Sequence, residues 1–597
     1  MLQRARPSEQ RTSPLVAALA FAGFAASVTQ TVAVPLVPEL PRLPHTSALS
    51  ASWVITAASS GTGWPPGKRG VATAVMSSML GTGATLGLPF PATVAARFDP
   101  TDPATKPDPL QEIHEVEMEP STLASPAVMT IAGAAVETAA SLDIVNPATG
   151  TPFALVPAGD RAHVNAAFEA ATRAFETWRE DEEHRRQSLR AMADAVLDAA
   201  DELAPVLTAE QGKPLGDARR EFAGAAAWLR YYADLELPPE VVRDDDEARV
   251  EIVRRPLGAV AAIAPFNFPI VIGFAKVASA LRVGDTVVLK PSPYTPLATL
   301  RLGELLGKIL PAGVLNVLSG GDEIGPMMTT HPLARAVSFT GSTATGRKIA
   351  AVAGDDLKRM ILELGGNDPM IVLDDVDVDA VVEQLFPRAF NNNGQACVAP
   401  MRIYAAREIR SALVDVFADR ARAAKVGDGF LPATVLGPLN NAPQRDRVAG
   451  LVTDAVAHGA RVVTGGTAIG GAGYFYEPTI VTDVSDGVRI VDEEQFGPAL
   501  PIVEYTDIDD ALRRANSGMF GLGGSVWSAD TERAAAVAQR LETGLSWVNT
   551  HTALSPALPF GGAKWSGLGT EGSPRGLDGY SDFQVIYRAK NVPSSRV

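Results

Sequence analysis

The chain contains a single cysteine, Cys397, whose neighbours differ from those of an ordinary buried thiol. A free cysteine usually behaves as a small apolar side chain of the core. Residues 391–396 instead read Asn-Asn-Asn-Gly-Gln-Ala, and these polar and glycine residues suit a turn. A thiol on such a turn can be accessible and reactive. On the residues alone, the inert core cysteine stays an open alternative.

A carboxylate ends one of the predicted apolar strands. Glu363 lies in the run Met-Ile-Leu-Glu-Leu-Gly-Gly, residues 360–366, where an unpaired buried charge would be costly. It could be a glutamate held by a salt bridge. An acid in a costly position and one accessible thiol also raise the hypothesis of a nucleophile with its general base.

Two glycine-rich turns follow predicted strands and could approach an anionic ligand. Residues 339–346 read Phe-Thr-Gly-Ser-Thr-Ala-Thr-Gly, where Gly341 permits the turn and Ser342 can cap the next helix. Free N–H groups at such a helix start can bind an anion. Residues 316–321, which include Gly320, end the preceding strand in a similar way. Both patterns are also common without a ligand, so neither defines a site by itself.

The elements that must position these residues alternate between strand and helix. Apolar residues at helical spacing predict helices within 162–204 and 217–235. Short β-branched runs predict strands at 259–266, 285–290, 314–320, 334–341 and 359–366. Such alternation indicates an α/β fold with a parallel, doubly wound sheet, which binds ligands outside the carboxyl ends of its strands. A second α/β series follows Cys397, so the sequence predicts a two-domain α/β enzyme.

Seven motifs, found in a fixed order, make the chain similar to the NAD(P)-dependent aldehyde dehydrogenases. The resemblance covers roughly residues 142–587, about three quarters of the chain. The motifs are APFNFP (264–269), KPS (290–292), FTGSTATG (339–346), LELGG (362–366), GQAC (394–397), EEQFGP (493–498) and PFGGAKWSGLG (559–569).

The resemblance implies a fold of three parts: a Rossmann-type dinucleotide-binding domain, an α/β catalytic domain and a small β arm for oligomerisation. The expected boundaries are an N-terminal extension at 1–135, the dinucleotide-binding domain at 140–237 and 256–364, the catalytic domain at 365–573, and the arm at 238–255 and 574–590.

The resemblance also implies roles for individual residues. Cys397 would be the nucleophile, and its backbone N–H and the Asn267 amide would hold the oxyanion. Glu363 would be the general base, and Lys276 a proton-relay or structural lysine. No metal ligands are expected. The implied cofactor-binding residues are Phe266, Lys290, Ser292, Gly320, Gly341, Ser342, Leu364, Glu494 and Phe496.

Among these, Lys290 would bind the adenosine ribose, Ser342 with its helix start the pyrophosphate, and Glu494 the nicotinamide ribose. Many NAD-preferring relatives carry a glutamate after KPS, whereas this chain has Pro293. A glutamate there would repel a 2′-phosphate and proline does not. We therefore expect NAD or NADP to be used, with NAD slightly favoured as in the family.

The implied chemistry accounts for these residue types. Thiolate attack on an aldehyde builds an alkoxide, and one oriented N–H donor to it is typically worth ~3–4 kcal/mol. Collapse sends a hydride to the nicotinamide and leaves a thioester. A glutamate then deprotonates the water that releases the acid.

Two other functions remain as alternatives. In a coenzyme A-acylating relative a thiol would release the acyl group, and retention of Glu363 argues against this. A non-enzymatic, membrane-attached protein would have no reason to keep Cys397, Glu363 and Asn267 together.

The composition of the chain limits the kinds of partner that it can bind. The chain has 52 Lys and Arg against 68 Asp and Glu, a net charge of −16, which argues against a nucleic acid partner. An apolar fraction of 46% is ordinary for a globular protein. We expect a small aldehyde as the partner, a homodimer or homotetramer, and a cytoplasmic location.

The N-terminal part of the chain differs in composition from the rest. Residues 15–36 are uncharged and follow Arg4, Arg6 and Arg11, so they could form a signal peptide or a single membrane helix. Two stretches, VTQTVAVPLVPELPRL (28–43) and the later KRGVATAVMSSMLGTGATLGLPF (68–90), resemble fragments of a major facilitator transporter. Two such stretches cannot form a transport pathway, so we expect a non-functional remnant. Membrane attachment is the alternative if residues 15–36 insert.

Overall fold

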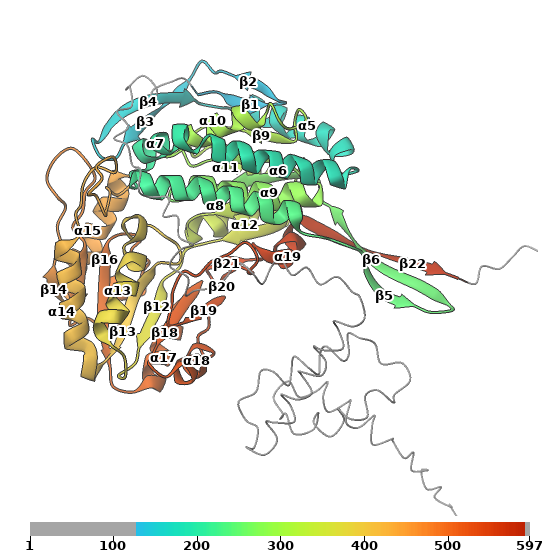
Figure 1. The fold of residues 1–597 in the computed structure, drawn as a ribbon. Coiled ribbons are helices and arrows are strands. Elements are labelled where there is room, and N and C mark those ends of the chain that lie inside the picture. Colours follow the sequence, from blue (N-terminus) through green and yellow to red (C-terminus); the bar gives the residue numbers. More distant parts are fainter. Residues whose placement is uncertain (1–126, 591–597) are drawn as a thin grey trace, which may run out of the picture. The chain divides into compact units, whose positions relative to one another are not determined.

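The computed structural model describes residues 127–590. Within them, an eight-stranded sheet has the order β2-β1-β9-β8-β7-β10-β11-β21 (Figure 1). The five strands from β9 to β11 are parallel, while β1 and β21 run antiparallel at the two sides. The strands are β1 (Met129–Ile131), β2 (Ala134–Val136), β7 (Ala259–Ile263), β8 (Thr286–Lys290), β9 (Leu315–Val317), β10 (Ala334–Thr340), β11 (Arg359–Glu363) and β21 (Gly567–Leu568).

Helices cover both faces of this first sheet. On one face α5, α11 and α12 contact the parallel strands, and on the other α9 and α10 do so, with α6, α7 and α8 packed outside them (Figure 1). Because both faces are covered, β7 and β8 are almost wholly apolar and buried. The helices are α5 (Arg161–Trp178), α6 (Glu182–Asp198), α7 (Ala200–Gln211), α8 (Leu215–Asp234), α9 (Pro269–Val283), α10 (Leu297–Leu306), α11 (Ile324–Thr329) and α12 (Thr343–Asp355).

The predicted parallel, doubly wound sheet is confirmed. Each of the five strands expected from the sequence matches one of its parallel strands. Parallel strands deliver their carboxyl ends to one edge of the sheet. The segments that follow β9, β8, β7, β10 and β11 therefore meet along that edge, and the residues at these strand ends include Gly320, Lys290, Asn267, Gly341 and Leu364.

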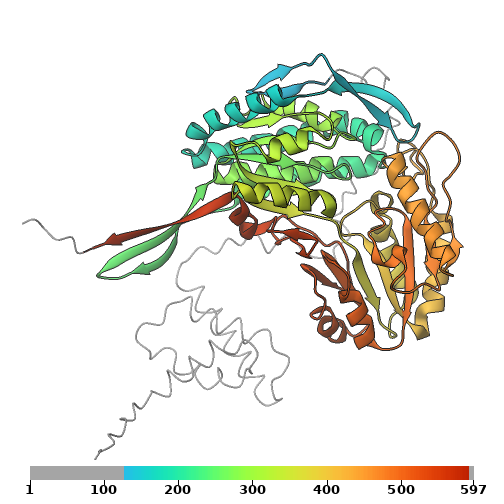
Figure 2. The same cartoon turned by 180° about the vertical axis from the view of Figure 1, so that it is seen from behind.

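A second sheet of seven strands has the order β14-β15-β16-β13-β12-β18-β19 and is parallel except at β14. Helices α13 and α14 pack on one face, and α15, α17 and α18 on the other (Figure 2). The strands are β12 (Asp368–Val372), β13 (Pro400–Ala406), β14 (Arg461–Thr464), β15 (Thr479–Thr482), β16 (Ala499–Tyr505), β18 (Gly523–Trp527) and β19 (Leu545–Val548). The helices are α13 (Val378–Ala389), α14 (Arg407–Ala423), α15 (Ala442–Ala457), α16 (Arg489–Asp492), α17 (Ile508–Asn516) and α18 (Thr531–Ala538).

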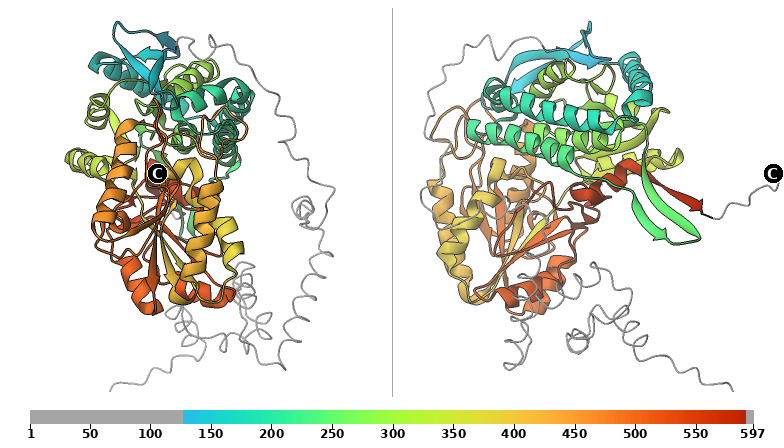
Figure 3. Two further views of the ribbon diagram at one scale, coloured as in Figure 1. Left: turned by 90° about the vertical axis from the view of Figure 1, so that its left-hand side faces the viewer. Right: turned by 45° about the vertical axis from the view of Figure 1, so that its right-hand side comes forward.

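Three smaller sheets complete the described fold. Two are pairs, β3 (Ser141–Asn146) with β4 (Thr151–Pro157), and β17 (Phe520–Gly521) with β20 (Ala563–Lys564). The third is an antiparallel arm, order β22-β6-β5, which projects from the two large sheets (Figures 2 and 3). Its strands are β5 (Glu240–Asp244), β6 (Ala248–Pro256) and β22 (Ser581–Ala589), the last preceded by the short helices α19 (Ser573–Gly576) and η4 (Leu577–Tyr580).

The ordered sheet begins earlier than the sequence suggested. Strand β1 and most of β2 fall inside residues 1–135, which we had assigned to the N-terminal extension. The reason is that β1 covers the side of β9, with Thr130 opposite Val317. None of the helices between residues 127 and 590 has the length and apolarity that a bilayer crossing requires. The segment 15–36 and both transporter-like stretches lie outside the described residues.

The first prediction compares two shortened chains, one starting at Ala127 and one at Glu137. Only the second lacks β1, whose Met129 and Ile131 are 0% and 7% exposed. Losing two such buried side chains should cost about 3–5 kcal/mol. For a unit of this size that lowers the melting temperature by about 3–5 °C, since the entropy of unfolding scales with length. Equal melting temperatures in a thermal scan would show that β1 adds no stability.

Candidate active site

The loop that carries Cys397 is a tight turn held in left-handed backbone conformations. It follows α13 as the short helix η3 (Asn391–Gly394), in which Asn392, Asn393 and Gly394 have φ of 49°, 60° and 74°. Asparagine and glycine are the residues that adopt this region most readily. A Cβ on Gly394 would lie 2.3 Å from the carbonyl oxygen of Gly497. The polar segment read from the sequence is therefore a packed turn that presents the cysteine.

Cys397 is partly exposed, and apolar side chains pack against it. It packs against the buried side chains of Val398, Leu522 and Trp547. Burial raises the pKa of the Cys397 thiol well above its usual range, and the negative charge of Glu363 raises it further. Both effects disfavour the thiolate form of Cys397 in the described structure.

Glu363 is the last residue of β11 and is 4% exposed. Among the described residues, its Oε1 atom has no hydrogen-bond partner. Burial, followed by the negative charge of Glu571, raises the pKa of Glu363 to about 8. A carboxyl group with this pKa can exchange a proton near neutral pH, which a general base must do.

Asn267 lies between β7 and α9 and is 2% exposed. Its side-chain Nδ2 donates a hydrogen bond of 2.9 Å to the carbonyl oxygen of Gln395, two residues before Cys397. An amide nitrogen carries two hydrogens, so the second remains for another acceptor. The structure therefore brings Asn267, Glu363 and the Cys397 loop to one place from three distant parts of the sequence.

Lys276 has a partner that the sequence did not predict. Its Nζ atom lies 2.5 Å from Oε1 of Glu571, and the lysine side chain is fully buried. Glu571 in turn acts on Glu363 through its charge. The two residues of the ion pair are 295 positions apart, so no local pattern in the sequence could have linked them.

The candidate pyrophosphate site is the start of α12. Ser342 caps this helix, its Oγ accepting a hydrogen bond of 3.2 Å from the Thr345 N–H. The first turn has no acidic residue, and the Thr345–Ser342 hydrogen bond is exposed. A Cβ on Gly346 would lie 2.3 Å from Leu364, and one on Gly341 2.5 Å from the Phe339 ring. These close approaches require glycine and leave the helix N–H groups open to an anion.

Lys290, Ser292 and Gly320 lie at the neighbouring strand ends. Lys290 ends β8 and is 4% exposed, and its Nζ donates to the carbonyl oxygen of Pro291 at 3.1 Å. Burial lowers the pKa of Lys290 to about 8, while the negative charges of Asp322 and Glu323 act in the opposite direction. Those two acidic residues directly follow the turn that contains Gly320.

Glu494, Phe496 and Phe266 lie on the side of the Cys397 loop. Oε1 of Glu494 accepts a hydrogen bond of 2.9 Å from the Gly366 N–H, and a Cβ on Gly365 would approach Oε2 closely, at 2.4 Å. Burial raises the pKa of Glu494 to about 7. The rings of Phe266 and Phe496 meet edge to face, with their centres 5.8 Å apart.

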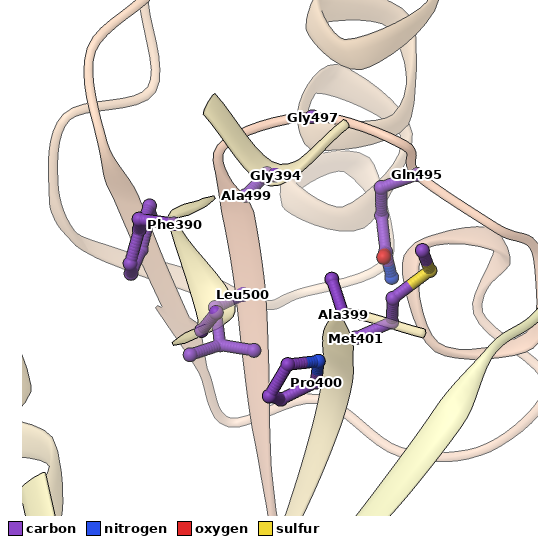
Figure 4. Close-up of a pocket in the computed structure, with 10 residues that line it drawn as sticks. Phe390, Gly394, Ala399, Pro400, Met401, Gln495, Gly497, Ala499 and Leu500 are labelled. Atoms are coloured by element: carbon purple, nitrogen blue, oxygen red, sulfur yellow. The ribbon is translucent and has the colours of Figure 1, made fainter. Parts of the chain in front are cut away.

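A small cavity lies behind the nucleophile loop (Figure 4). Its volume is about 10 Å³, and its lining includes Phe390, Gly394, Met401 and Gln495. A cavity of this size holds at most one water molecule. It is therefore a packing gap beneath the loop and not a substrate site.

Comparisons with known proteins agree with this fold and identify the family. The sequence profile described as "Aldehyde dehydrogenase family" matches residues 135–586. The chain is 41% identical over 458 residues to a probable succinate-semialdehyde dehydrogenase [NADP(+)] of Sinorhizobium fredii, covering 74% of this chain and 92% of that protein. It is 37% identical to a glutarate-semialdehyde dehydrogenase of Pseudomonas aeruginosa, covering 75% and 94%. The NAD⁺ complex of an aldehyde dehydrogenase from Bacillus cereus superimposes with a TM-score of 0.78 at 31% identity, covering 80% of this chain and 100% of that one.

The chain therefore belongs to the aldehyde dehydrogenase family. It is an oxidoreductase that uses NAD or NADP to oxidise an aldehyde to the carboxylic acid. These findings favour neither the coenzyme A-acylating enzyme nor the non-enzymatic protein that the sequence had left open.

The second prediction concerns Glu363 and the pH dependence of stability. Its folded-state pKa is raised from 4.5 to about 8. Between these values the folded protein holds a proton that the unfolded chain releases, so the wild type loses stability as pH rises. Glu363→Gln removes this effect. The melting temperature of the variant minus that of the wild type should therefore rise by about 2–4 °C between pH 5 and pH 8.

The matched control is Glu180→Gln, which changes a glutamate whose side chain is 71% exposed. Its melting temperature should follow that of the wild type at every pH. A difference for Glu363→Gln that stays constant from pH 5 to pH 8 would contradict a raised pKa.

Proposed function

We propose that Cys397, Glu363 and Asn267 carry the reaction. The observation that supports this most is the Asn267 amide hydrogen-bonded to the loop of the thiol, with the buried Glu363 carboxyl close enough to affect the thiol's pKa. The Cys397 thiol loses its proton to solvent water, and Sγ bonds to the aldehyde carbon as the carbonyl π bond breaks. The carbonyl oxygen becomes an oxyanion, stabilised by the free Asn267 Nδ2 hydrogen and the Cys397 backbone N–H.

The dinucleotide, when bound, supplies the acceptor for the hydride of the aldehyde carbon. The acyl group then remains on Sγ of Cys397 as a thioester. Glu363 takes a proton from water, the resulting hydroxide attacks the acyl carbon, and the carbon–sulfur bond breaks. The thiolate leaves, regains a proton, and the carboxylic acid departs.

The residues at the strand ends fit the cofactor. Glycine at 341 and 346 avoids contacts that a Cβ would make at 2.5 and 2.3 Å, and the open start of α12 can bind the pyrophosphate. We propose that Lys290 and Ser292 hold the adenosine ribose, with Gly320 letting it approach the backbone. Leu364, Phe266 and Phe496 would border the nicotinamide end, and Glu494 would hold its ribose.

We propose that both cofactors are accepted, with NAD preferred. Pro293 removes the glutamate that would discriminate strongly against a 2′-phosphate. The charges of Asp322 and Glu323 still act at Lys290, and they would repel that phosphate. Because both carboxylates are exposed, solvent and salt screen this repulsion, so the preference for NAD is moderate.

We propose an uncharged aldehyde as the substrate. The two relatives named above are named for semialdehydes, whose carboxylate would need a cation near the site. Here the thiol packs against Val398, Leu522 and Trp547. The buried lysines Lys213 and Lys276 are already paired with carboxylates. An apolar group therefore matches the surroundings of the thiol better than a charged one.

We further propose that the arm forms a homodimer or homotetramer. Its outer strand β22 exposes Phe583, Val585 and Tyr587, at 55%, 62% and 60%. An apolar edge strand of this kind is a typical pairing surface. The division into a dinucleotide-binding domain, a catalytic domain and an arm also remains our proposal, with the first domain now starting at β1. A cytoplasmic location is consistent with a single cysteine.

The third prediction separates the two halves of the reaction. Cys397→Ala removes the nucleophile and should abolish both NAD(P)H formation and acid release. Glu363→Gln keeps the shape of the side chain but cannot take a proton from water. It should form NAD(P)H up to about one equivalent per active site and then stall as the thioester. Rapid mixing of each variant with cofactor and an aldehyde measures this directly.

Three results would revise the role of Glu363. Undiminished steady turnover of Glu363→Gln would exclude it as the base and direct attention to Glu571. A complete absence of the burst, with the cofactor still bound, would show that Glu363 is needed before the thioester forms. A slower burst of full size would mean that it also helps to deprotonate Cys397.

The fourth prediction is a steady-state panel with both cofactors. An uncharged aliphatic or aromatic aldehyde should have a kcat/KM at least about tenfold above that of succinate semialdehyde, equal to about 1.4 kcal/mol. NAD should exceed NADP by about 3- to 30-fold. The control is the double variant Asp322→Asn with Glu323→Gln. It should bring the kcat/KM values with NAD and NADP closer together and leave the ranking of the aldehydes by kcat/KM unchanged. A thousandfold preference for NAD would contradict the relaxed choice of cofactor.

A further inference from the structure

A buried ion pair lies behind the oxyanion donor and is not used in the reaction described above. Lys213, which follows α7, and Glu221 of α8 have side chains that are 0% and 1% exposed, with 2.5 Å between Nζ and Oε2. Burying two charges costs several kcal/mol per ion, and a pair of apolar residues is often at least as stable. Stability alone therefore does not explain this pair.

The pair binds the Asn267 carbonyl and the start of the helix that follows it. Nζ of Lys213 donates to the carbonyl oxygen of Asn267 at 2.8 Å. Oε1 of Glu221 accepts hydrogen bonds from the N–H groups of Ile270 at 2.8 Å and Val271 at 3.3 Å, in the first turn of α9. The same two charges thus hold Asn267 and the start of the helix that follows it.

Asn267 is tied to the nucleophile loop on its other side. Nδ2 of Asn392 donates to the carbonyl oxygen of Asn267 at 2.9 Å, so this oxygen accepts from both Lys213 and the loop. The Asn267 side chain donates to the Gln395 carbonyl, also at 2.9 Å. A continuous set of hydrogen bonds therefore runs from Glu221 through Lys213 and Asn267 to the residues just before Cys397.

We propose that Lys213 and Glu221 are positioning residues, which fix the direction of the Asn267 amide. This inference rests on the proposed role of Asn267 as oxyanion donor. Such donors act because they are oriented before the charge develops, and a small displacement removes much of their effect. The charge on Glu221 holds the Lys213 ammonium in place. The ammonium in turn holds the Asn267 carbonyl, which fixes the position of the whole residue.

The decisive variant is Lys213→Met combined with Glu221→Gln. It leaves no unpaired buried charge, and the side-chain amide oxygen that replaces the carboxylate at position 221 can still accept from Ile270. The melting temperature should therefore lie above those of the two single variants. The carbonyl of Asn267 nevertheless loses the Lys213 donor. The rate constant of the NAD(P)H burst should stay about 10- to 100-fold below that of the wild type, with the Kd for the cofactor within about twofold.

Glu210→Gln is the matched control. Glu210 is also fully buried, and its carboxylate accepts from the N–H groups of Leu297 and Ala298 at 2.7 and 3.0 Å, at the start of α10. It performs the same structural task for a different helix. Glu210→Gln should lower the melting temperature of the protein, while the rate constant of the NAD(P)H burst stays within about twofold of the wild-type value.

Asn267→Ala shows whether the pair acts through Asn267. Removing an oxyanion donor should slow the burst by about 10²- to 10³-fold. Adding Lys213→Met and Glu221→Gln to Asn267→Ala should slow it by no more than about twofold again. A further 10- to 100-fold loss in that background, or a normal burst in the double variant, would overturn the positioning role. If the double variant does not fold, Glu221→Gln alone is tested, once in the wild-type protein and once combined with Asn267→Ala.

These outcomes are distinct from a failure of the proposed function itself. If the wild type forms no NAD(P)H with any aldehyde, or if Asn267→Ala leaves the burst unchanged, then the role of Asn267 fails and the inference falls with it. If Asn267→Ala slows the burst and the effects of the pair are independent of it, only the positioning role is wrong.

Discussion

The hydrogen bond from the Asn267 amide to the carbonyl of Gln395 joins the two α/β units at the candidate active site. Asn267 follows β7 of the first sheet, and Gln395 precedes β13 of the second. The proposed base, Glu363, comes from the first sheet, and the proposed nucleophile, Cys397, precedes a strand of the second, so neither sheet holds the complete candidate site. Further bonds cross the same junction, from Nδ2 of Asn392 to the Asn267 carbonyl and from Nδ2 of Asn440 to the Glu210 carbonyl.

Burial of acidic groups is a second constraint on this site. The pKa values of Glu363 and Glu210 are raised to about 8 and that of Glu494 to about 7, each mainly by burial. Glu210 and Glu494 accept hydrogen bonds from backbone N–H groups, while Oε1 of Glu363 lacks a partner among the described residues. The carboxyl groups of Glu210 and Glu494 thus have backbone donors, whereas one oxygen of Glu363, the proposed base, is free to accept a proton from water.

Local patterns in the sequence were enough to predict the parallel strands, the Ser342 helix cap and the turn before Cys397. Each of these depends on residues near one another in the chain, such as β-branched runs or left-handed asparagines. The partners of buried charges were not predictable in this way. Lys276 meets Glu571 across 295 positions, and Lys213 reaches the Asn267 carbonyl from a different element. In the sequence such lysines look like ordinary surface residues, and only packing shows that they are buried.

The raised pKa of Cys397 also bears on how the resting protein meets oxidants. Peroxides and alkylating agents react with the thiolate and hardly with the thiol. Burial, the largest cause of the raised pKa, disfavours ionisation of this sulfur. A lower thiolate content slows sulfenic acid formation at this sulfur. Because the chain has no second cysteine that could reduce an oxidised sulfur through a disulfide, this slower oxidation is its own protection against irreversible damage.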